Sequence, residues 1–275
     1  MLAAAAARLR EAGVDAPERD ARLLLRWASG LGAAAFSARL AEPPWAGEAE
    51  RFAQAVAARA SRVPVSQIIG RRAFWGRDFR VTPDVLDPRP ETETLIAAAL
   101  NGPSPARILD LGTGSGCILL TLLAEWPRAR GLGTDTSAAA LAVAAGNALA
   151  LGVAERAEFR LADWCGGLAG RFDLIVSNPP YIAAAEVAAL EPEVRRHEPR
   201  QALTPEGDPG DGLDAYRRIA GGLPALLAPG GRVLLEIGPT QAGSVAGILE
   251  SNAMAVSAVL PDLDGRDRVI FAHAV

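Results

Sequence analysis

From residue 107 onward, short apolar runs alternate with longer stretches of helical periodicity. The run Phe172–Ser177 is apolar at nearly every position, as expected for a strand covered on both faces. Such alternation predicts an α/β fold, a parallel sheet with helices on both faces. Ligands bind these sheets beyond the carboxyl ends of the strands. The expected strands are 107–111, one that ends at Asp135, 158–162, 172–177, 232–237 and two within 253–275, and the expected helices are 115–125, 137–150, 212–227 and 241–250.

The segment before this alternation has a different pattern. Residues 1–62 are helical in periodicity, with helices expected at 20–29 and 47–60 on either side of a break at Pro43-Pro44. Gln67–Ile69 and Phe79–Val81 are expected to be the strands of a hairpin. We therefore predict a helical domain over 1–64, a hairpin and proline-rich linker over 65–90, and the sheet domain over 91–275.

The composition narrows the class of protein. The net charge is −4 and all basic residues are arginine, which disfavours nonspecific nucleic-acid binding because phosphate contacts need a basic face. Cys117 and Cys165 form no CxxC pattern, so we expect neither a metal site nor a disulfide framework. The N-terminus has a helical pattern rather than that of a signal peptide, and no uncharged run is long enough to span a bilayer. These features predict a cytoplasmic protein without a membrane segment.

A glycine-rich segment follows the first strand and precedes a helix. Gly112, Gly114 and Gly116 stand at alternate positions, with Thr113 and Ser115 between them. Glycine lets a backbone turn tightly and approach a ligand closely, and the helix start supplies free N–H groups. The spacing departs from the dinucleotide pattern G-x-G-x-x-G. It suits a nucleoside joined to an amino acid, without a pyrophosphate; the alternative is a turn with only a packing role.

Polar residues also follow the next two strands. Asp135 can accept hydrogen bonds from both ribose hydroxyls, although it could instead cap the helix that starts near Ser137. Asp163 can accept from an exocyclic amine, and Trp164 can cover an adenine face. The alternative for Trp164 is a partly buried core position. We expect all three residues to bind the same ligand.

The most specific segment is Asn178-Pro179-Pro180-Tyr181, which ends the fourth strand. Proline lacks an N–H but keeps its carbonyl, so this loop is stiff, rich in acceptors and poor in donors. The Asn178 side-chain oxygen adds an acceptor, and Tyr181 offers a flat face and a hydroxyl. Such a loop suits an NH₂ group. Together the motifs predict methyl transfer from the sulfonium of S-adenosylmethionine to an amide or amine nitrogen, with Asn178 beside both substrates.

Further segments make the chain resemble the peptide chain release factor N(5)-glutamine methyltransferases, the PrmC/HemK family. They are Phe74–Gly76, Pro88–Glu93, Asp110–Gly116, Asp135, Asp163-Trp164, Ser177–Ile182 and Glu198–Leu203. The resemblance covers nearly the whole length. Its Pro-Arg-Pro-Glu-Thr-Glu element is much more specific than the glycine-rich segment, and it separates this family from nucleobase methyltransferases that share the Asn-Pro-Pro-Tyr type of loop.

The resemblance implies a Rossmann-like, seven-stranded class I methyltransferase sheet with a small N-terminal helical domain. It implies S-adenosylmethionine as cofactor and, as substrate, the glutamine in the Gly-Gly-Gln motif of release factors. It also implies that Asn178 to Tyr181 bind that glutamine, that Gly112 to Gly116, Asp135 and Trp164 bind the cofactor, and that the helical domain helps to hold the release factor. A monomer without membrane or direct nucleic-acid contacts is expected.

Two other functions stay open from the residues alone. The same loop could hold the NH₂ of a flipped adenine in DNA or RNA, with Tyr181 stacked on the base. Alternatively, the chain could be a cofactor-binding module without turnover, although such a module would be expected to lose Asn178 and its prolines. Arg89, Glu91 and Glu93 could line the cleft or lock the linker to the domain, and the structural role is favoured. His197 is interpreted as a surface or packing residue.

Overall fold

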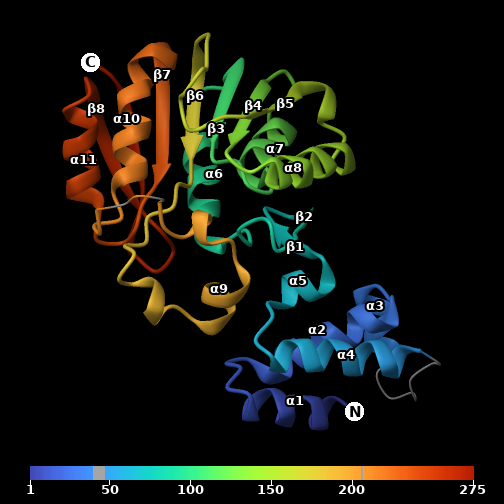
Figure 1. Cartoon of the computed structure of the whole chain (residues 1–275). Coiled ribbons are helices and arrows are strands. Elements are labelled where there is room, and N and C mark those ends of the chain that lie inside the picture. The colour runs from blue at the N-terminus through green and yellow to red at the C-terminus, as the bar shows by residue number, and fades with distance from the viewer. Residues whose placement is uncertain (40–46, 206, 208) are drawn as a thin grey trace. The chain divides into compact units, whose positions relative to one another are not determined.

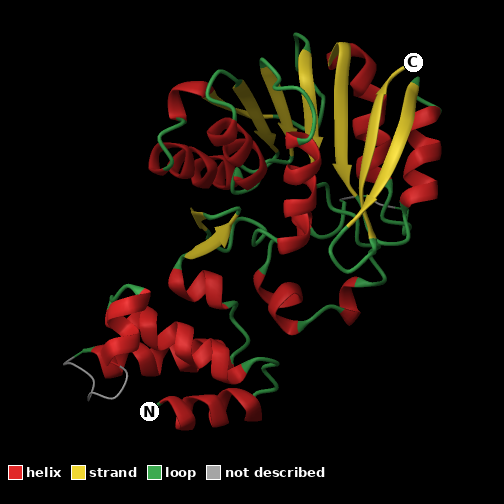
Figure 2. Cartoon of the chain, turned by 180° about the vertical axis from the view of Figure 1, so that it is seen from behind, coloured by secondary structure: helices red, strands yellow, loops and turns green. Residues whose placement is uncertain are grey.

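The computed structural model describes residues 1–39, 47–205, 207 and 209–275 (Figures 1 and 2). The chain divides into two compact units, which are Met1–Arg71 with Glu191–His197, and Arg72–Leu190 with Glu198–Val275. We call them the helical unit and the sheet unit. Within the described residues, no helix has both the length and the apolar character needed to cross a membrane.

The helical unit is built on a small aliphatic and aromatic core. Leu9, Leu24, Phe36, Phe52 and Val56 are all buried in it. The expected helices at 20–29 and 47–60 are confirmed, while the predicted break at Pro43-Pro44 lies outside the described residues. Its helices are α1 (Leu2–Glu11), α2 (Pro17–Ser29), α3 (Ala33–Arg39), α4 (Glu48–Ala60), α5 (Val65–Ile69) and α9 (Pro192–His197).

The predicted strand at Gln67–Ile69 is wrong, because these residues lie in α5. Pro64 precedes this single helical turn, and Gly70 ends it in the left-handed conformation, with its N–H bonded to the Ser66 carbonyl. Ile68 and Ile69 pack against the helical-unit core. The hairpin itself is present slightly later in the chain, as β1 (Arg71–Phe74) and β2 (Arg77–Arg80).

The sheet unit contains, among the described residues, a seven-stranded sheet of order β5-β4-β3-β6-β7-β9-β8. The five strands from β5 to β7 in this order pair in parallel with their neighbours, and β9 pairs antiparallel with both β7 and β8. This is the predicted class I methyltransferase arrangement. The strands are β3 (Arg107–Leu111), β4 (Arg130–Asp135), β5 (Ala157–Leu161), β6 (Phe172–Ser177), β7 (Leu227–Glu236), β8 (Met254–Pro261) and β9 (Asp267–Ala274).

Helices cover both faces of this sheet (Figure 2). On one face α6 (Glu93–Leu100), α7 (Cys117–Glu125) and α8 (Ala138–Ala150) bury residues such as Leu95 and Leu119. On the other, α10 (Asp214–Leu226) and α11 (Ala242–Glu250) bury Ile219 and Leu249. Short 3-10 turns are η1 (Pro90–Thr92), η2 (Ala154–Arg156), η3 (Val187–Ala189) and η4 (Arg200–Ala202).

Candidate active site

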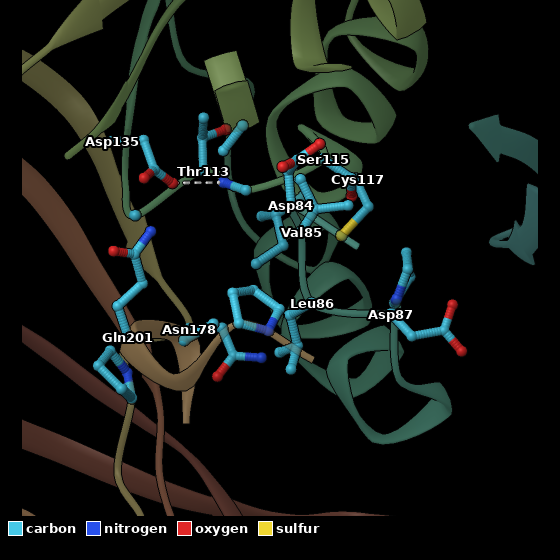
Figure 3. A pocket seen from close by; sticks show the side chains of 18 of the residues that line it. Asp84, Val85, Leu86, Asp87, Thr113, Ser115, Cys117, Asp135, Asn178 and Gln201 are labelled. Carbon is cyan, nitrogen blue, oxygen red and sulfur yellow. Dashed lines mark hydrogen bonds between the residues drawn. The ribbon is translucent and has the colours of Figure 1, made fainter. Parts of the chain in front are cut away.

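The parallel register brings the predicted motifs to one edge of the sheet. Leu111 of β3 pairs with Thr134 of β4 and with Ser177 of β6, so these three strands end together. The Ser177 hydroxyl donates to the Leu111 carbonyl at 2.6 Å, which fixes the start of the Asn-Pro-Pro-Tyr loop against β3. A pocket opens at this edge (Figure 3). We call it the strand-end pocket; the predicted site residues that line it are Gly112, Thr113, Gly114, Ser115, Asp135, Trp164, Asn178 and Pro180.

The segment Gly112–Gly116, which we call the glycine loop, owes its shape to left-handed backbone angles. Gly112, Gly114 and Gly116 have φ of 71°, 55° and 80°, which explains why α7 begins at Cys117 rather than at Ser115. A Cβ on Gly114 would meet no atom within 4 Å, so the loop leaves open space there. A Cβ on Gly116 would lie 2.8 Å from Leu120. Gly116 does not line the pocket, and the structure gives it a packing and capping role.

Asp110 lies beneath this loop and is fully buried. Its carboxylate accepts a hydrogen bond from the Thr113 hydroxyl at 2.7 Å. Burial raises the pKa of Asp110 to about 7, against the opposing effect of this hydrogen bond. This hydrogen bond holds Thr113 in place, so Asp110 stabilises the loop.

Asp135 joins the end of β4 to the glycine loop. One carboxylate oxygen accepts from the Gly114 N–H at 3.0 Å (Figure 3). The other accepts from the Ser137 N–H at 2.9 Å. The helix cap itself is the Ser137 side chain, which accepts from the Ala140 N–H. Burial raises the pKa of Asp135, while the backbone hydrogen bonds oppose that rise. Each oxygen keeps a second lone pair, so both can still accept from ligand hydroxyls.

Trp164 and Asp163 separate at the end of β5. Trp164 lines the pocket, is half-buried, and would be 3.4 Å from a Cβ on Gly112. Asp163 does not line it, because its carboxylate forms an exposed ion pair with Arg218 of α10. The indole is therefore placed against the glycine loop, whereas the predicted amine contact of Asp163 remains a prediction that this arrangement does not support.

The segment Asn178–Tyr181, which we call the acceptor loop, is divided between two hollows. Asn178 and Pro180 line the strand-end pocket, and Figure 3 shows the Asn178 amide across the pocket from Asp135. Pro179 is buried and lines neither hollow. Tyr181 faces a second hollow, which we call the Tyr181 cavity; its lining residues are Arg72, Arg89, Pro90, Glu91, Tyr181, Glu236 and Arg268.

Ion pairs organise the Tyr181 cavity. Arg268 is buried and paired with Asp262 at 3.1 Å, and it donates to the Tyr181 hydroxyl at 3.5 Å. Arg89 donates to both carboxylate oxygens of the buried Glu198 at 2.7 Å. Burial raises the pKa of the Tyr181 phenol to about 12, so it stays protonated at neutral pH.

The residues whose roles were left open by the sequence lie in different places. Arg89 lines both hollows, and Glu91 lines the Tyr181 cavity. Glu93 accepts from the Trp75 N–H at 2.7 Å and so ties the hairpin to α6. His197, in the helical unit, accepts through its backbone carbonyl from Gln67 at 2.8 Å.

Sequence reasoning missed Thr92 and Glu236. Asn178 donates through Nδ2 to the Thr92 hydroxyl at 3.2 Å, and Thr92 is 1 % exposed. Glu236 ends β7 and is equally buried, and its Oε2 atom has no hydrogen-bond partner among the described residues. Thr92 stands inside the Pro-Arg-Pro-Glu-Thr-Glu segment, and Glu236 ends a strand at the ligand edge; both positions were available as signals.

The strand-end pocket fits a nucleoside–amino-acid sulfonium such as S-adenosylmethionine. Open space over Gly114 accommodates a close ligand, Asp135 offers acceptors, and Trp164 offers an aromatic face. Asn178 adds an acceptor at the same pocket. Among the described residues, no group of three or more His, Cys, Asp or Glu side chains is placed to hold a metal ion. The arrangement is suited to group transfer by positioning.

Comparison with known proteins agrees with this geometry. Residues 1–70 match the family model "PrmC N-terminal domain", and residues 90–208 match "Methyltransferase small domain". A protein of Cereibacter sphaeroides named "Release factor glutamine methyltransferase" is 60% identical over 99% of this chain and 96% of its own length. Proteins of the same name from Rhodospirillum rubrum and Bradyrhizobium diazoefficiens are 50% and 44% identical, over 97% and 98% of this chain and 82% and 92% of their own lengths. The chain belongs to the family of S-adenosylmethionine-dependent release factor glutamine methyltransferases.

Proposed function

We propose that this enzyme transfers a methyl group from S-adenosylmethionine to the side-chain amide nitrogen of the glutamine in the Gly-Gly-Gln motif of peptide chain release factors. The observation that carries the proposal is the position of Asn178 and Pro180 on the same pocket as the glycine loop and Asp135. The names of the relatives support the same substrate.

In this proposal the pocket residues have separate tasks. Gly112 to Ser115, Asp135 and Trp164 hold the cofactor, with Gly116 shaping the loop. Asn178 and the Pro179 carbonyl accept hydrogen bonds from the two N–H groups of the substrate amide, Pro180 stiffens the loop, and Tyr181 packs beside the glutamine. The sulfonium supplies the methyl group. Because Asp163 pairs with Arg218, any contact that it makes with the cofactor lies at the edge of the pocket.

The chemical difficulty lies in the nucleophile. An amide nitrogen shares its lone pair with the carbonyl, so it must be aimed and its sharing weakened. Two hydrogen bonds from the NH₂ group to fixed acceptors do both. Holding the reactants in such a geometry can contribute about 7–11 kcal/mol to lowering the barrier. Methyl transfer turns the sulfonium into a neutral thioether and leaves the amide nitrogen with four bonds and a positive charge. Because this cation is a strong acid, the nitrogen's proton can leave to water afterwards.

The rest of the chain fits the same proposal. We infer that residues 1–64 help to hold the release factor, that residues 65–90 connect them to the catalytic domain at 91–275, and that the enzyme acts as a cytoplasmic monomer without direct nucleic-acid contacts. The net charge of −4 supports the last point. Light scattering tests the monomer, and salt-dependent DNA binding would contradict the absence of nucleic-acid contacts.

The deciding experiment incubates the protein with isotope-labelled S-adenosylmethionine and a purified release factor. Mass spectrometry should find one added methyl group on the Gly-Gly-Gln glutamine. A release factor with that glutamine replaced by alanine is the control and should gain none. Label on another residue, or on an adenine of DNA supplied in a parallel reaction, would overturn the proposal.

A further inference from the structure

The Tyr181 cavity contains a buried acceptor that no described residue uses. Glu236, which ends β7, lines this cavity and is 1 % exposed. Its Oε2 atom is buried and has no hydrogen-bond partner among the described residues. A buried carboxylate oxygen without a donor costs free energy. The cavity volume is about 350 Å³, so there is room for a ligand that brings an N–H group to this oxygen.

Two hydrogen-bond donors line the same cavity. The Tyr181 hydroxyl has, among the described residues, a single hydrogen bond, which it accepts from Arg268 at 3.5 Å. Its own proton is left for a ligand, and it is present at neutral pH because burial raises the pKa of this phenol to about 12. Arg89 donates to Glu198 through Nη2 at 2.7 Å, and its Nη1 has no hydrogen-bond partner in the described part of the chain. The cavity thus offers donors as well as an acceptor.

The charges around the cavity disfavour a simple ion as its ligand. Each arginine that lines the cavity has a carboxylate partner outside the lining; the pairs are Arg268–Asp262, Arg89–Glu198 and Arg72–Asp87, with N···O distances of 3.1, 2.7 and 3.7 Å. An anion would therefore meet Glu91 and Glu236 without an arginine whose charge is uncompensated. A metal or ammonium cation has no acceptor for the Tyr181 and Arg89 donors. The ligand that fits is uncharged and both donates and accepts.

A peptide group is such a ligand, because it carries one N–H donor and one carbonyl acceptor. In the proposed function, the strand-end pocket already holds the side-chain amide of the glutamine. Tyr181 follows Pro180 directly in the chain, and Arg89 lines both hollows, so the Tyr181 cavity lies next to that amide. The amide of the substrate that comes next is the main-chain peptide group joining the glutamine to the glycine before it.

We propose that the Tyr181 cavity is a subsite for the main-chain peptide group between the second glycine and the glutamine of the Gly-Gly-Gln motif. The N–H of this group donates to Glu236, and its carbonyl accepts from the Tyr181 hydroxyl and from Arg89. The inference rests on the proposed function, since it names the part of the same substrate that is bound beside the reacting side chain. With the main chain held here and the side-chain amide held by Asn178, the glutamine is fixed at both ends.

The first test uses Tyr181→Phe in the full-length protein, with a purified release factor as substrate. Phenylalanine keeps the flat face beside the glutamine and removes only the hydroxyl. We expect KM for the release factor to rise by about threefold to tenfold, the effect of one neutral hydrogen bond, and kcat to change much less. Calorimetric S-adenosylmethionine affinity should be unchanged. Ser257→Ala, which removes a hydroxyl of β8 that lines neither hollow, is the control and should leave KM and kcat unchanged.

The second test removes the peptide N–H from the substrate. Two synthetic peptides carry the Gly-Gly-Gln motif, one with the ordinary amide before the glutamine and one with an ester there, which replaces the N–H by an oxygen. For the wild-type protein the ester should raise Kd by about tenfold to a hundredfold, because a hydrogen bond to a charged acceptor is lost.

The same pair of peptides is then measured with two protein variants. In Glu236→Gln the acceptor is neutral, so the ratio of ester to amide Kd should fall by a factor of about three or more. The ester also weakens the carbonyl as an acceptor, but it does so for every variant, so the change in the ratio reports the Glu236 contact. Glu48→Gln, at a buried glutamate of α4 that lines neither hollow, should keep the wild-type ratio.

These measurements separate the inference from the proposed function. If the wild-type protein methylates no release factor, the proposed function fails. If it does, then either a wild-type KM in Tyr181→Phe or an equal ester effect in wild type and Glu236→Gln overturns the subsite. Should Glu236→Gln not fold, or the peptides bind too weakly to measure, Tyr181→Phe decides: a raised KM with normal kcat supports the subsite, and an unchanged KM contradicts it.

Discussion

The Asp135 carboxylate accepts a hydrogen bond from the Gly114 backbone N–H at 3.0 Å, which ties the end of β4 to the glycine loop after β3. The residue thus shapes the loop and lines the pocket. We expect Asp135→Ala to weaken S-adenosylmethionine binding by about tenfold to a hundredfold, because hydrogen bonds to a charged group contribute about 1.5–3 kcal/mol. Isothermal titration calorimetry measures this directly.

Asp173 offers a matched control for that experiment. Its carboxylate also accepts from two backbone N–H groups, those of Ala106 at 2.9 Å and Arg107 at 2.8 Å, where β3 begins rather than ends. Asp173→Ala should cost similar stability and leave cofactor affinity unchanged. Equal affinities for the Asp135 and Asp173 variants would refute the ribose-binding role.

The backbone of Gly114 gives a second prediction. With φ of 55° and open space at the Cβ position, Gly114→Ala should cost about 1–2 kcal/mol of stability through the left-handed conformation. The added methyl group also enters the space where the cofactor approaches, so S-adenosylmethionine affinity should fall further. Gly152→Ala, with φ of 69° and equally open surroundings away from the pocket, should show the same loss of stability with normal affinity. Identical affinities would mean that the cofactor does not approach Gly114.

The edge of the sheet at which the pocket opens could be predicted from the sequence, because local sequence patterns determine it. Apolar runs such as Phe172–Ser177 form strands, and parallel strands align their ends, so Asp135 and Asn178 had to reach the same edge. The single turn of α5 was mistaken for a strand, since a segment of five residues has too few positions to show its period.

The long-range contacts that hold the site residues in place could not be predicted in this way. Thr92 and Asn178 are 86 residues apart, and their contact depends on how η1 packs against the end of β6. The same holds for Asp163, whose carboxylate pairs with Arg218, 55 residues later, rather than lining the pocket. Side-chain direction at a strand end is a property of packing, which periodicity does not report.

The acceptor loop gives a third prediction. Asn178→Ala removes the acceptor for the substrate amide but none of the backbone that shapes the glycine loop. We expect kcat/KM for the release factor to fall by a factor on the order of a hundred or more, comparable to the loss of one oxyanion-hole donor. Cofactor affinity should change much less. Methyl transfer with a labelled cofactor, together with calorimetry, separates the two quantities.

Asn101→Ala is the control for this variant, because Asn101 is exposed at the end of α6 and does not line the pocket. It should behave as wild type in both measurements. A parallel loss of transfer and cofactor affinity in Asn178→Ala would mean that the acceptor subsite lies elsewhere.

Glu193 links the short helix α9 to α4 within the helical unit, and it gives a pH-dependent prediction. Its carboxylate accepts from Arg59 at 2.7 Å and from Arg62 at 2.6 Å, and Arg59 is also paired with Asp20 at 2.8 Å. Burial raises the pKa of Glu193, but the two arginines outweigh burial, so the pKa lies below the usual 4.5. Glu193→Gln should therefore destabilise the protein at neutral pH, by about 1–2 kcal/mol after allowing for solvent screening of this partly exposed group.

A depressed pKa stabilises the fold above the unfolded-state value, and this contribution is lost as the pH falls through the folded-state value. The difference in the free energy of unfolding between wild type and Glu193→Gln should therefore be full at about pH 7 and shrink steadily below about pH 4.5. Chemical denaturation followed by circular dichroism at a series of pH values measures it. Glu250→Gln, at an exposed position of α11, should show no such difference. If the Glu193 variant differed from wild type by the same amount at every pH, its charge would not be what holds α9 to the helical unit.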